Sequence, residues 1–346
     1  MSVANTPVDP VIADIFARFF DGDPVSADII NTSREDTDFR NTAIITTASG
    51  EKYVLKIASN SFTFPGRIHM WKRTVEEYRS LGYYSPRIFT DKNGIFPEIQ
   101  YQGHTCIVYA EEYSGYRALE DRMTADGKEA GADTGAYAQD IWSMTAKIAA
   151  KKLDYTEYPS AYCLFDTFAP DDQMDEVLEN ALEWKKTASA LPEGFAAQVQ
   201  RIWEIWSANR ETLKERYRRL PTSVFQADLN STNLLIDEDG RFAGVYDFNL
   251  CGKDVFLNYL MRENYGNFEE EIGLIREALQ IACKHYVFSR EEKAAVLPLY
   301  RCLKPLWYIR VEDLKEAGND PAKIQHCLDQ AEYYLTSDID FISYMG

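Results

Sequence analysis

Apolar residues first recur along the chain at the spacing of one face of a helix. Asp9 and Pro10 are typical of a helix start, and the apolar positions after them follow helical periodicity. These positions are Ile12, Ile15, Phe16, Phe19 and Phe20. Residues 24–30, 43–47 and 53–58 then have the composition of strands separated by polar turns. The pattern predicts an antiparallel sheet early in the chain, with the helix packed beneath it.

The pattern changes from strands to helices near Gly115. Before it, residues 68–81 read as a helix, and residues 86–90 and 104–110 read as further strands. After it, a polar, glycine-rich loop at 124–135 is followed mainly by helical periodicity. We therefore predict an α+β protein with an N-terminal lobe over residues 1–112 and a larger, mostly helical lobe over residues 113–346.

One of the later helices has a clear start. Ser289 and Glu292 have the spacing of a capping box. Pro298 and Pro305 follow within the helical pattern, and proline removes a main-chain donor from a helix. We expect these prolines to kink or interrupt that helix.

The most informative stretch is a predicted hairpin over residues 224–254. Two apolar runs, 234–236 and 242–246, flank an Asp-Glu-Asp-Gly turn, which is a hairpin signal. Asp228 and Asn233 stand five residues apart on the polar loop before the hairpin, and Asp247 closes its second strand. The sequence therefore predicts three oxygen-bearing side chains around one hairpin.

These three residue types fit phosphoryl transfer from a nucleotide. That reaction needs a carboxylate to orient and deprotonate the attacking hydroxyl, and oxygen ligands to hold magnesium on the phosphates. Asp228 suits the first role, whereas Asn233 and Asp247 suit the second. Their spacing matches the catalytic loop and the Asp-Phe-Gly position of protein kinases.

The segment most resembles the aminoglycoside phosphotransferase and choline kinase branch of the kinase-like proteins. The resemblance implies a bilobal protein-kinase-like fold that binds ATP, or GTP, with Mg2+ in the cleft between its lobes. Three positions depart from the usual pattern: Gln226 replaces a histidine, Asn249 replaces the kinase glycine, and Asn258 replaces an aspartate found in many members. These departures bear on substrate and rate more than on the type of reaction.

Lys56 interrupts an otherwise apolar strand. Such a lysine either keeps an edge strand soluble or contacts the phosphates from the third strand, and the helix that follows favours the second interpretation. That helix should carry a glutamate that pairs with Lys56. Glu77 shares a helical face with apolar residues and is favoured over Glu76, although both stay open.

The resemblance also places the nucleotide base. The strand ending near residue 112 corresponds to the hinge between lobes, where main-chain groups near Ala110 and Glu112 would bind the adenine edge and Tyr109 would line the back of the pocket. The loop over residues 31–40, where a kinase covers the phosphates, contains no glycine. The glycine-rich signature of protein kinases is therefore absent.

Composition and charge narrow the function further. With 45% apolar and 27% charged residues among 346, the chain resembles a soluble globular protein. A net charge of −18 argues against nucleic acid as a partner.

The sequence contains neither a secretory signal nor an apolar run long enough to span a membrane. Its six scattered cysteines predict a reduced, cytoplasmic protein, and its four dispersed histidines do not support a zinc enzyme or a Ser-His-Asp hydrolase.

We therefore expect a small-molecule kinase that transfers the γ-phosphoryl group of ATP, or GTP, to a hydroxyl. Residues 113–346 hold 26 Lys and Arg against 40 Asp and Glu, an excess of 14 negative charges, so an amine-bearing acceptor is favoured. A metabolite kinase acting on choline, homoserine or a sugar shares the same motif. A nucleotide-binding pseudokinase without turnover is the alternative from another class, and the retained Asp228 argues against it. The sequence does not indicate the oligomeric state.

Overall fold

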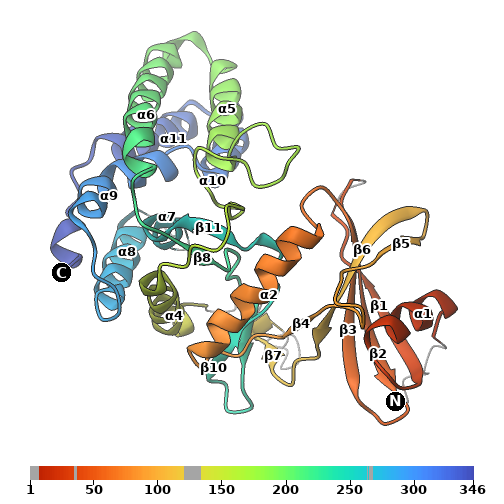
Figure 1. The fold of residues 1–346 in the computed structure, drawn as a ribbon. Coiled ribbons are helices and arrows are strands. Elements are labelled where there is room, and N and C mark those ends of the chain that lie inside the picture. Colours follow the sequence, from red (N-terminus) through yellow and green to blue (C-terminus); the bar gives the residue numbers. More distant parts are fainter. Residues whose placement is uncertain (1–7, 35–36, 121–133, 263, 265–267) are drawn as a thin grey trace. The chain divides into compact units, whose positions relative to one another are not determined.

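The computed structural model describes residues 8–34, 37–120, 134–262, 264 and 268–346 (Figure 1). Its contacts divide the chain into two compact units. The first, here called the sheet unit, comprises Met1–Thr134, Ala169–Asp171 and Asp228–Gly252; the second, the helical unit, comprises Gly135–Phe168, Asp172–Ala227 and Lys253–Gly346. The lobe boundary expected at residues 112 and 113 stays a prediction. Most of the expected loop at 124–135 lies outside the described residues.

Six strands form the main sheet of the sheet unit, in the order β1-β2-β3-β6-β4 with β5 also paired to β6. Every pairing is antiparallel, as expected. The strands are β1 (Pro24–Asn31), β2 (Phe39–Thr47), β3 (Lys52–Ser59), β4 (Ile88–Phe89), β5 (Glu98–Tyr101) and β6 (His104–Glu112). The sequence prediction missed β5 and began β2 four residues late.

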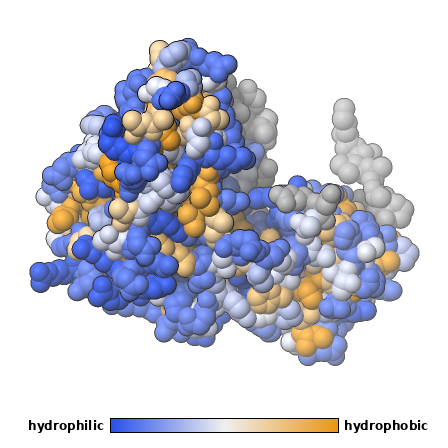
Figure 2. Space-filling model, turned by 90° about the horizontal axis from the view of Figure 1, so that it is seen from above, coloured by the Kyte–Doolittle hydropathy of each residue, from blue (hydrophilic) through white to orange (hydrophobic). Residues whose placement is uncertain are grey.

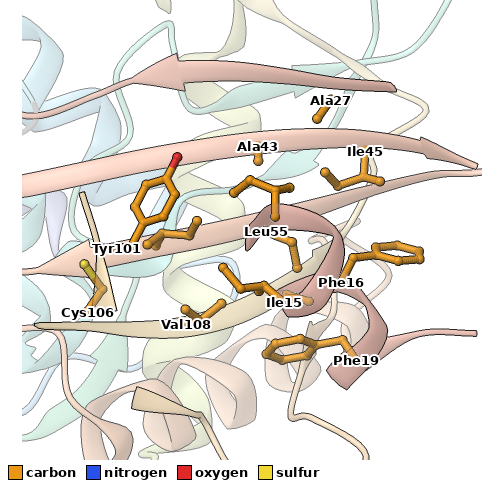
Figure 3. Close-up of a cluster of buried hydrophobic side chains, with 13 residues drawn as sticks. Ile15, Phe16, Phe19, Ala27, Ala43, Ile45, Leu55, Tyr101, Cys106 and Val108 are labelled. Carbon is orange, nitrogen blue, oxygen red and sulfur yellow. The ribbon is translucent and has the colours of Figure 1, made fainter. Parts of the chain in front are cut away.

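One face of this sheet packs against the first helix, α1 (Pro10–Phe19). The Asp9 carboxylate accepts a hydrogen bond of 2.7 Å from the Val11 amide and so caps the helix. Ile15, Phe16 and Phe19 point from the helix into a cluster of buried side chains from the strands (Figure 3). The cluster includes Ala27, Ala43, Ile45, Leu55, Ile57, Cys106, Val108 and Ala110. The predicted amphipathic helix beneath the sheet is confirmed.

The predicted hairpin is also present and belongs to the sheet unit. It consists of β9 (Leu234–Ile236) and β10 (Phe242–Val245), which pair antiparallel. A further strand, β7 (Arg117–Ala118), extends it into a three-stranded sheet. A 3-10 helix, η3 (Phe248–Leu250), follows directly after Asp247.

Main-chain contacts at Tyr84 join this hairpin to the rest of the sheet unit. Tyr84 follows helix α2 (Pro65–Ser80). Its amide donates to the Ala243 carbonyl at 2.9 Å, and its carbonyl accepts from the Val245 amide at 3.0 Å. A Cβ added to Gly244 would lie 1.8 Å from the Tyr84 carbonyl oxygen. Only glycine therefore permits the two backbones to approach this closely.

Helices dominate the helical unit. They are α4 (Ala138–Lys151), α5 (Glu176–Ser189), α6 (Ala196–Tyr217), α7 (Phe256–Arg262), α8 (Phe268–Ala282), α9 (Arg290–Leu303), α10 (Tyr308–Ala317) and α11 (Pro321–Thr336). Short 3-10 helices lie at Thr134–Tyr137, Glu193–Phe195 and Ile342–Tyr344. Two short strands, β8 (Thr222–Phe225) and β11 (Gly252–Val255), pair with each other. The combination of an antiparallel sheet with a helical region confirms the predicted α+β class.

Helix α9 confirms the predicted capping box and excludes an interruption at Pro298, whereas a kink there stays a prediction. The capping box of Ser289 and Glu292 is formed, with the Glu292 amide 3.1 Å from Ser289 Oγ. Pro298, however, does not interrupt the helix, which continues to Leu303. The Pro298 carbonyl accepts a hydrogen bond of 2.9 Å from Asn209 Nδ2 of α6. The carbonyl that loses its helical donor because of the proline is that of Ala294, and it accepts a hydrogen bond of 3.4 Å from Arg216 Nη1 of α6.

The substitution at Asn258 has a local explanation. Asn258 is fully buried on α7, and its Nδ2 donates to Asp254 Oδ2 at 3.0 Å and to the Tyr162 carbonyl at 2.6 Å. Asp254 also accepts hydrogen bonds from Ser160 and Tyr217, each at 2.8 Å. A second carboxylate at position 258 would repel Asp254 in this buried network, whereas the asparagine amide donates to it.

Hydrophilic residues cover most of the face seen in Figure 2, with hydrophobic residues in separate patches among them. Among the helices in the described part of the chain, none combines the length and the apolar character needed to cross a bilayer.

We predict that Gly244→Ala lowers the free energy of unfolding by more than about 2 kcal/mol, because the new methyl group forces the hairpin away from Tyr84. Gly273→Ala on α8 is the matched control. An added Cβ there meets nothing within 4 Å, so alanine should stabilise the helix by about 0.5–1 kcal/mol. Denaturant unfolding measures both changes. Equal stability of the parent and Gly244→Ala would contradict the assigned contact.

Candidate active site

Strand register places a set of polar residues on the face of the main sheet opposite α1. Residues directly opposite each other on neighbouring strands share a face, as do residues two apart along one strand. Lys56 lies opposite Tyr109 of β6 and opposite Thr42 of β2. Glu111, two residues beyond Tyr109, and Arg40, two residues before Thr42, therefore share this face with Lys56. We call it the polar face of the sheet.

Two carboxylates act on the charge of Lys56. Burial alone would lower the pKa of its ammonium group, but the nearby carboxylates of Glu111 and Asp247 outweigh this effect, and the pKa lies above its usual value. Lys56 therefore stays charged although it is withdrawn from water. The functional interpretation of this strand lysine is consistent with its position on the central strand β3 rather than at a sheet edge.

Glu111 is a carboxyl group strongly perturbed by this arrangement. Only 8% of its surface is exposed, and burial raises the pKa of its carboxyl to about 7, against an opposing effect of Lys56 and a further increase from Asp247. A carboxyl with this pKa changes its protonation state near neutral pH. Carboxyl groups whose pKa is shifted by burial and by nearby charges are typical of functional sites.

A narrow cavity opens beside Lys56 on the polar face. It has a volume of about 60 Å3, and Asp247 and Asn249 line it together with residues of β2, β3 and β6. Tyr109, with 5% of its surface exposed, forms part of the wall. The strand lysine and the aspartate that ends β10 thus reach the same space, as the motif spacing suggested.

The loop before the hairpin holds Asp228 in a hydrogen-bonded frame. Asn233 Nδ2 donates to the Asp228 carbonyl at 2.9 Å and to its Oδ2 at 3.0 Å, and Asn230 Nδ2 donates to Oδ1 at 2.8 Å. Burial raises the pKa of Asp228, and the negative charge of Asp247 raises it further. Both effects make this carboxylate a better proton acceptor than an exposed aspartate.

Asn233 and Asp247 are neighbours across the hairpin. The Tyr246 amide donates to the Asn233 carbonyl at 3.1 Å, which extends the ladder of β9 and β10. Asp247 then adopts a left-handed backbone conformation with φ 57°, which aspartate tolerates better than most residues. Because Asn233 uses its Nδ2 to bind Asp228, its Oδ1 remains the atom suited to a cation.

This donor set fits magnesium on a nucleotide. Magnesium prefers oxygen ligands and is usually held by one or two side chains together with substrate phosphates and water. Across the described residues, no group of three or more His, Cys, Asp and Glu side chains is arranged to hold a metal without a substrate. Asn233 and Asp247 offer one amide and one carboxylate oxygen, as that mode of binding requires.

The two glutamates proposed as partners of Lys56 differ in environment. Glu77 is half-buried on α2, whereas Glu76 is exposed and pairs with Arg87 at 3.3 Å. The carboxylates that act most strongly on Lys56 are those of Glu111 and Asp247. A role for Glu77 stays a prediction.

The predicted hinge groups lie at the end of β6. Ala110 is paired with Leu55 of β3 on one side and with Phe89 of β4 on the other. The Glu112 amide donates to the Arg87 carbonyl at 2.9 Å, so a nucleotide base would use this amide only by replacing that bond. Binding of the adenine edge by these two residues stays a prediction.

Sequence reasoning missed Glu111 and Arg40. Both could have been found from the two-residue period of the strands, because Glu111 follows Tyr109 by two residues and Arg40 precedes the partner of Lys56 by two. The partner positions themselves depend on strand register, which the sequence alone leaves open. Gln226, noted for its departure from the family pattern, is fully buried, and Asn249 lines the cavity.

Comparison with known proteins identifies similar chains. A model of the phosphotransferase enzyme family (APH) matches residues 30–257. The fold is similar to that of amicoumacin kinase hAmiN, solved in complex with AMP-PNP, Ca2+ and Ami, with 13% identity, 96% of each chain covered and a TM-score of 0.53. A thermostable mutant of aminoglycoside phosphotransferase APH(4)-Ia, in its apo form, is also 13% identical over 95% of this chain and 98% of that chain, with a TM-score of 0.49.

Macrolide 2'-phosphotransferase MphH from Brachybacterium faecium is 12% identical over 95% of this chain and 98% of that chain, with a TM-score of 0.44. No curated protein matches the sequence. The family match and the similarity to hAmiN confirm the resemblance and the kinase-like fold expected from the sequence.

We predict that Glu111 makes the stability of the protein depend on pH. Its pKa is raised from 4.5 to about 7 in the folded protein, so between these values the folded protein holds a proton that the unfolded chain has lost. The stabilisation is complete below the lower value and is lost as the pH rises through the upper one, a change of up to about 3 kcal/mol.

Glu111→Gln removes this titration. Relative to the parent, the variant should gain stability between pH 5 and pH 8, measured by denaturant unfolding at each pH. Glu98→Gln, at an exposed position of β5, is the control and should follow the parent. A stability difference between Glu111→Gln and the parent that is the same at both pH values would refute the assignment.

Proposed function

Because the chain belongs to the phosphotransferase enzyme family, we propose that it transfers the γ-phosphoryl group of ATP, or GTP, to a hydroxyl group of a small molecule. The observation that carries the proposal is the common electrostatic environment of three side chains. Asp247 acts on the pKa of Lys56 and also on that of Asp228. One carboxylate thus lies within range of both the candidate phosphate-binding lysine and the candidate catalytic aspartate, all within the sheet unit.

Lys56 and the hairpin residues contribute to nucleotide binding in different ways. Lys56, kept charged by Glu111 and Asp247, binds the phosphate oxygens. Asn233 and Asp247 would hold Mg2+, which when bound neutralises charge on the phosphates. Each of these interactions strengthens as negative charge develops on the leaving nucleotide, so they lower the barrier as well as bind the substrate.

Asp228 acts on the acceptor. Its carboxylate accepts the proton of the acceptor hydroxyl as that oxygen forms a bond to the γ-phosphorus and the bond from phosphorus to the β,γ-bridging oxygen breaks. The products are the phosphorylated acceptor and the nucleoside diphosphate. Hydrogen bonds from Asn230 and Asn233 fix the orientation of the Asp228 carboxylate, so the proton acceptor is aligned before the substrate arrives.

The acceptor proposed here carries an amine. The 14 excess negative charges over residues 113–346 favour the capture of cationic molecules, an effect that salt weakens. A metabolite with a hydroxyl and an amine meets this requirement as well as an antibiotic does, because the catalytic residues act only on the hydroxyl and the nucleotide.

We predict that Asp228→Asn abolishes turnover and leaves nucleotide binding nearly unchanged. Asparagine keeps the size of the side chain but cannot accept the hydroxyl proton, and positioned acid-base catalysis contributes about 10²- to 10⁴-fold in rate. Steady-state rates with a phosphorylated acceptor, together with calorimetric titration of nucleotide, measure the two effects. A variant that keeps more than about a tenth of parental turnover would rule out this role for Asp228.

We also predict that Lys56→Ala and Asp247→Ala each reduce the stabilisation of the protein by Mg2+ and ATP. A ligand at 100 times its dissociation constant stabilises a protein by about 2.7 kcal/mol, and a tenfold loss of affinity halves this gain. Lys92→Ala is the control, because Lys92 pairs with Asp21 at 2.6 Å and its amide binds the carbonyl of Arg18 in α1. The shift in melting temperature on adding Mg2+ and ATP measures this stabilisation. Equal shifts in parent, control and both variants would exclude this nucleotide site.

A further inference from the structure

The connection between β1 and β2 differs from a glycine-rich phosphate-binding loop. Such loops present main-chain amides to the phosphate oxygens, yet residues 31–40 contain no glycine. Three described amides of this connection are engaged within it. Those of Thr32 and Ser33 donate to the Arg40 carbonyl and to Asn31 Oδ1, and that of Arg40 donates to Ser33 Oγ, each at 2.9 Å. These three amides are therefore not open to a phosphate, and the described side chains at this end of the sheet are the next candidates.

Arg40 is the cationic side chain best placed for this purpose. It lies opposite Ala58 of β3, two residues from the pair formed by Thr42 and Lys56, and so belongs to the polar face. It lines the same cavity as Lys56 and Asp247. Its positive charge opposes the ionisation of Lys56 and lowers the pKa of that group. The two cations therefore lie near each other on the polar face.

One edge of the Arg40 guanidinium is held in place by the protein. Its Nη2 lies 2.8 Å from Asp38 Oδ2 in an ion pair whose side chains are 15% and 17% exposed. Asp38 is oriented in turn by Asn60, whose Nδ2 donates to Oδ1 at 2.9 Å. Arg40 Nε is buried and makes no hydrogen bond to any described residue. Buried donors of this kind are usually satisfied, and guanidinium groups bind phosphate oxygens through such donors.

The charges around the cavity show why a second cation beside Lys56 favours the binding of a nucleoside triphosphate. Glu111, Asp228 and Asp247 bring three carboxylates to this region, whereas Lys56 brings one positive charge. A nucleoside triphosphate adds several negative charges more. Mg2+ and Arg34, whose charge lowers the pKa of Asp228, would offset part of this negative charge, and Arg40 adds a cation beside Lys56 at the cavity.

We propose that Arg40 binds the terminal phosphates of the nucleotide, in the role that main-chain amides play in a glycine-rich loop. The inference rests on the proposed function, because it assigns a residue to the same nucleotide site. It also makes a distinct claim: affinity gained through Arg40 depends on the phosphates and not on the base. The ion pair with Asp38 orients the guanidinium before the nucleotide binds.

The test compares the binding of MgATP and adenosine to the full-length protein and its variants by calorimetry. Arg40→Gln should weaken MgATP binding about 10- to 100-fold, the effect of losing a charged hydrogen-bond donor, and should leave adenosine affinity within about twofold. Arg40→Lys keeps the charge but loses the planar fork and should fall between parent and Arg40→Gln.

Asp38→Asn is the matched control, since it breaks the same ion pair and keeps the guanidinium. It should bind MgATP more tightly than Arg40→Gln does. If Arg40→Gln binds MgATP as tightly as the parent, or if Asp38→Asn weakens binding as much as Arg40→Gln does, the role of Arg40 is refuted and the proposed function stands. If the parent binds neither MgATP nor MgGTP, the proposed function and the role of Arg40 are both refuted.

Discussion

The approach of Gly244 to the main chain at Tyr84 is the constraint on which the candidate site depends. Hydrogen bonds of 2.9 and 3.0 Å from Tyr84 to Ala243 and Val245 attach the hairpin to the segment that follows α2, and no side chain larger than hydrogen fits at position 244. Asp228, Asn233 and Asp247 surround this hairpin, whereas Lys56, Glu111 and Arg40 come from the main sheet. Close backbone contact at one glycine thus brings residues about 190 positions apart in sequence into one electrostatic environment.

Ionisable side chains, rather than apolar packing, determine the chemistry of the polar face. The face opposite is apolar and packs against α1 (Figure 3). Burial and the negative charge of Asp247 raise the pKa values of Glu111 and Asp228. Asp247 itself adopts a left-handed backbone conformation. Such unfavourable features persist where function requires them. A polyanionic substrate with its cation would relieve part of the repulsion by binding Lys56 and Arg40.

The local elements of this chain were predictable because local physics dictates them. Helical periodicity after Asp9 predicted α1, and the turn at 237–240 predicted the hairpin with its bounds nearly correct. The spacing of Asp228, Asn233 and Asp247 predicted the type of reaction, because the chemistry needs those groups near one hairpin.

The non-local features were not predictable in the same way. Glu111 and Arg40 join the polar face through strand register, and the engagement of the Glu112 amide by Arg87 depends on the placement of β4. Pro298 was expected to kink or interrupt α9, but the helix continues to Leu303, and the Ala294 carbonyl bonds to Arg216 of α6. In each case a partner distant in sequence decides the outcome, and a single sequence does not reveal that partner.

The transfer of labelled phosphate from ATP tests the central claim most directly. The protein would be incubated with Mg2+ and ATP labelled at the γ-phosphate, or in parallel at the α-phosphate, together with a panel of hydroxyl-bearing acceptors with and without amines. The account predicts that the γ-label alone moves to an acceptor hydroxyl, most rapidly for an amine-bearing acceptor at low salt. Transfer of the α-label, or the absence of any Mg2+-dependent interaction with either ATP or GTP, would contradict it.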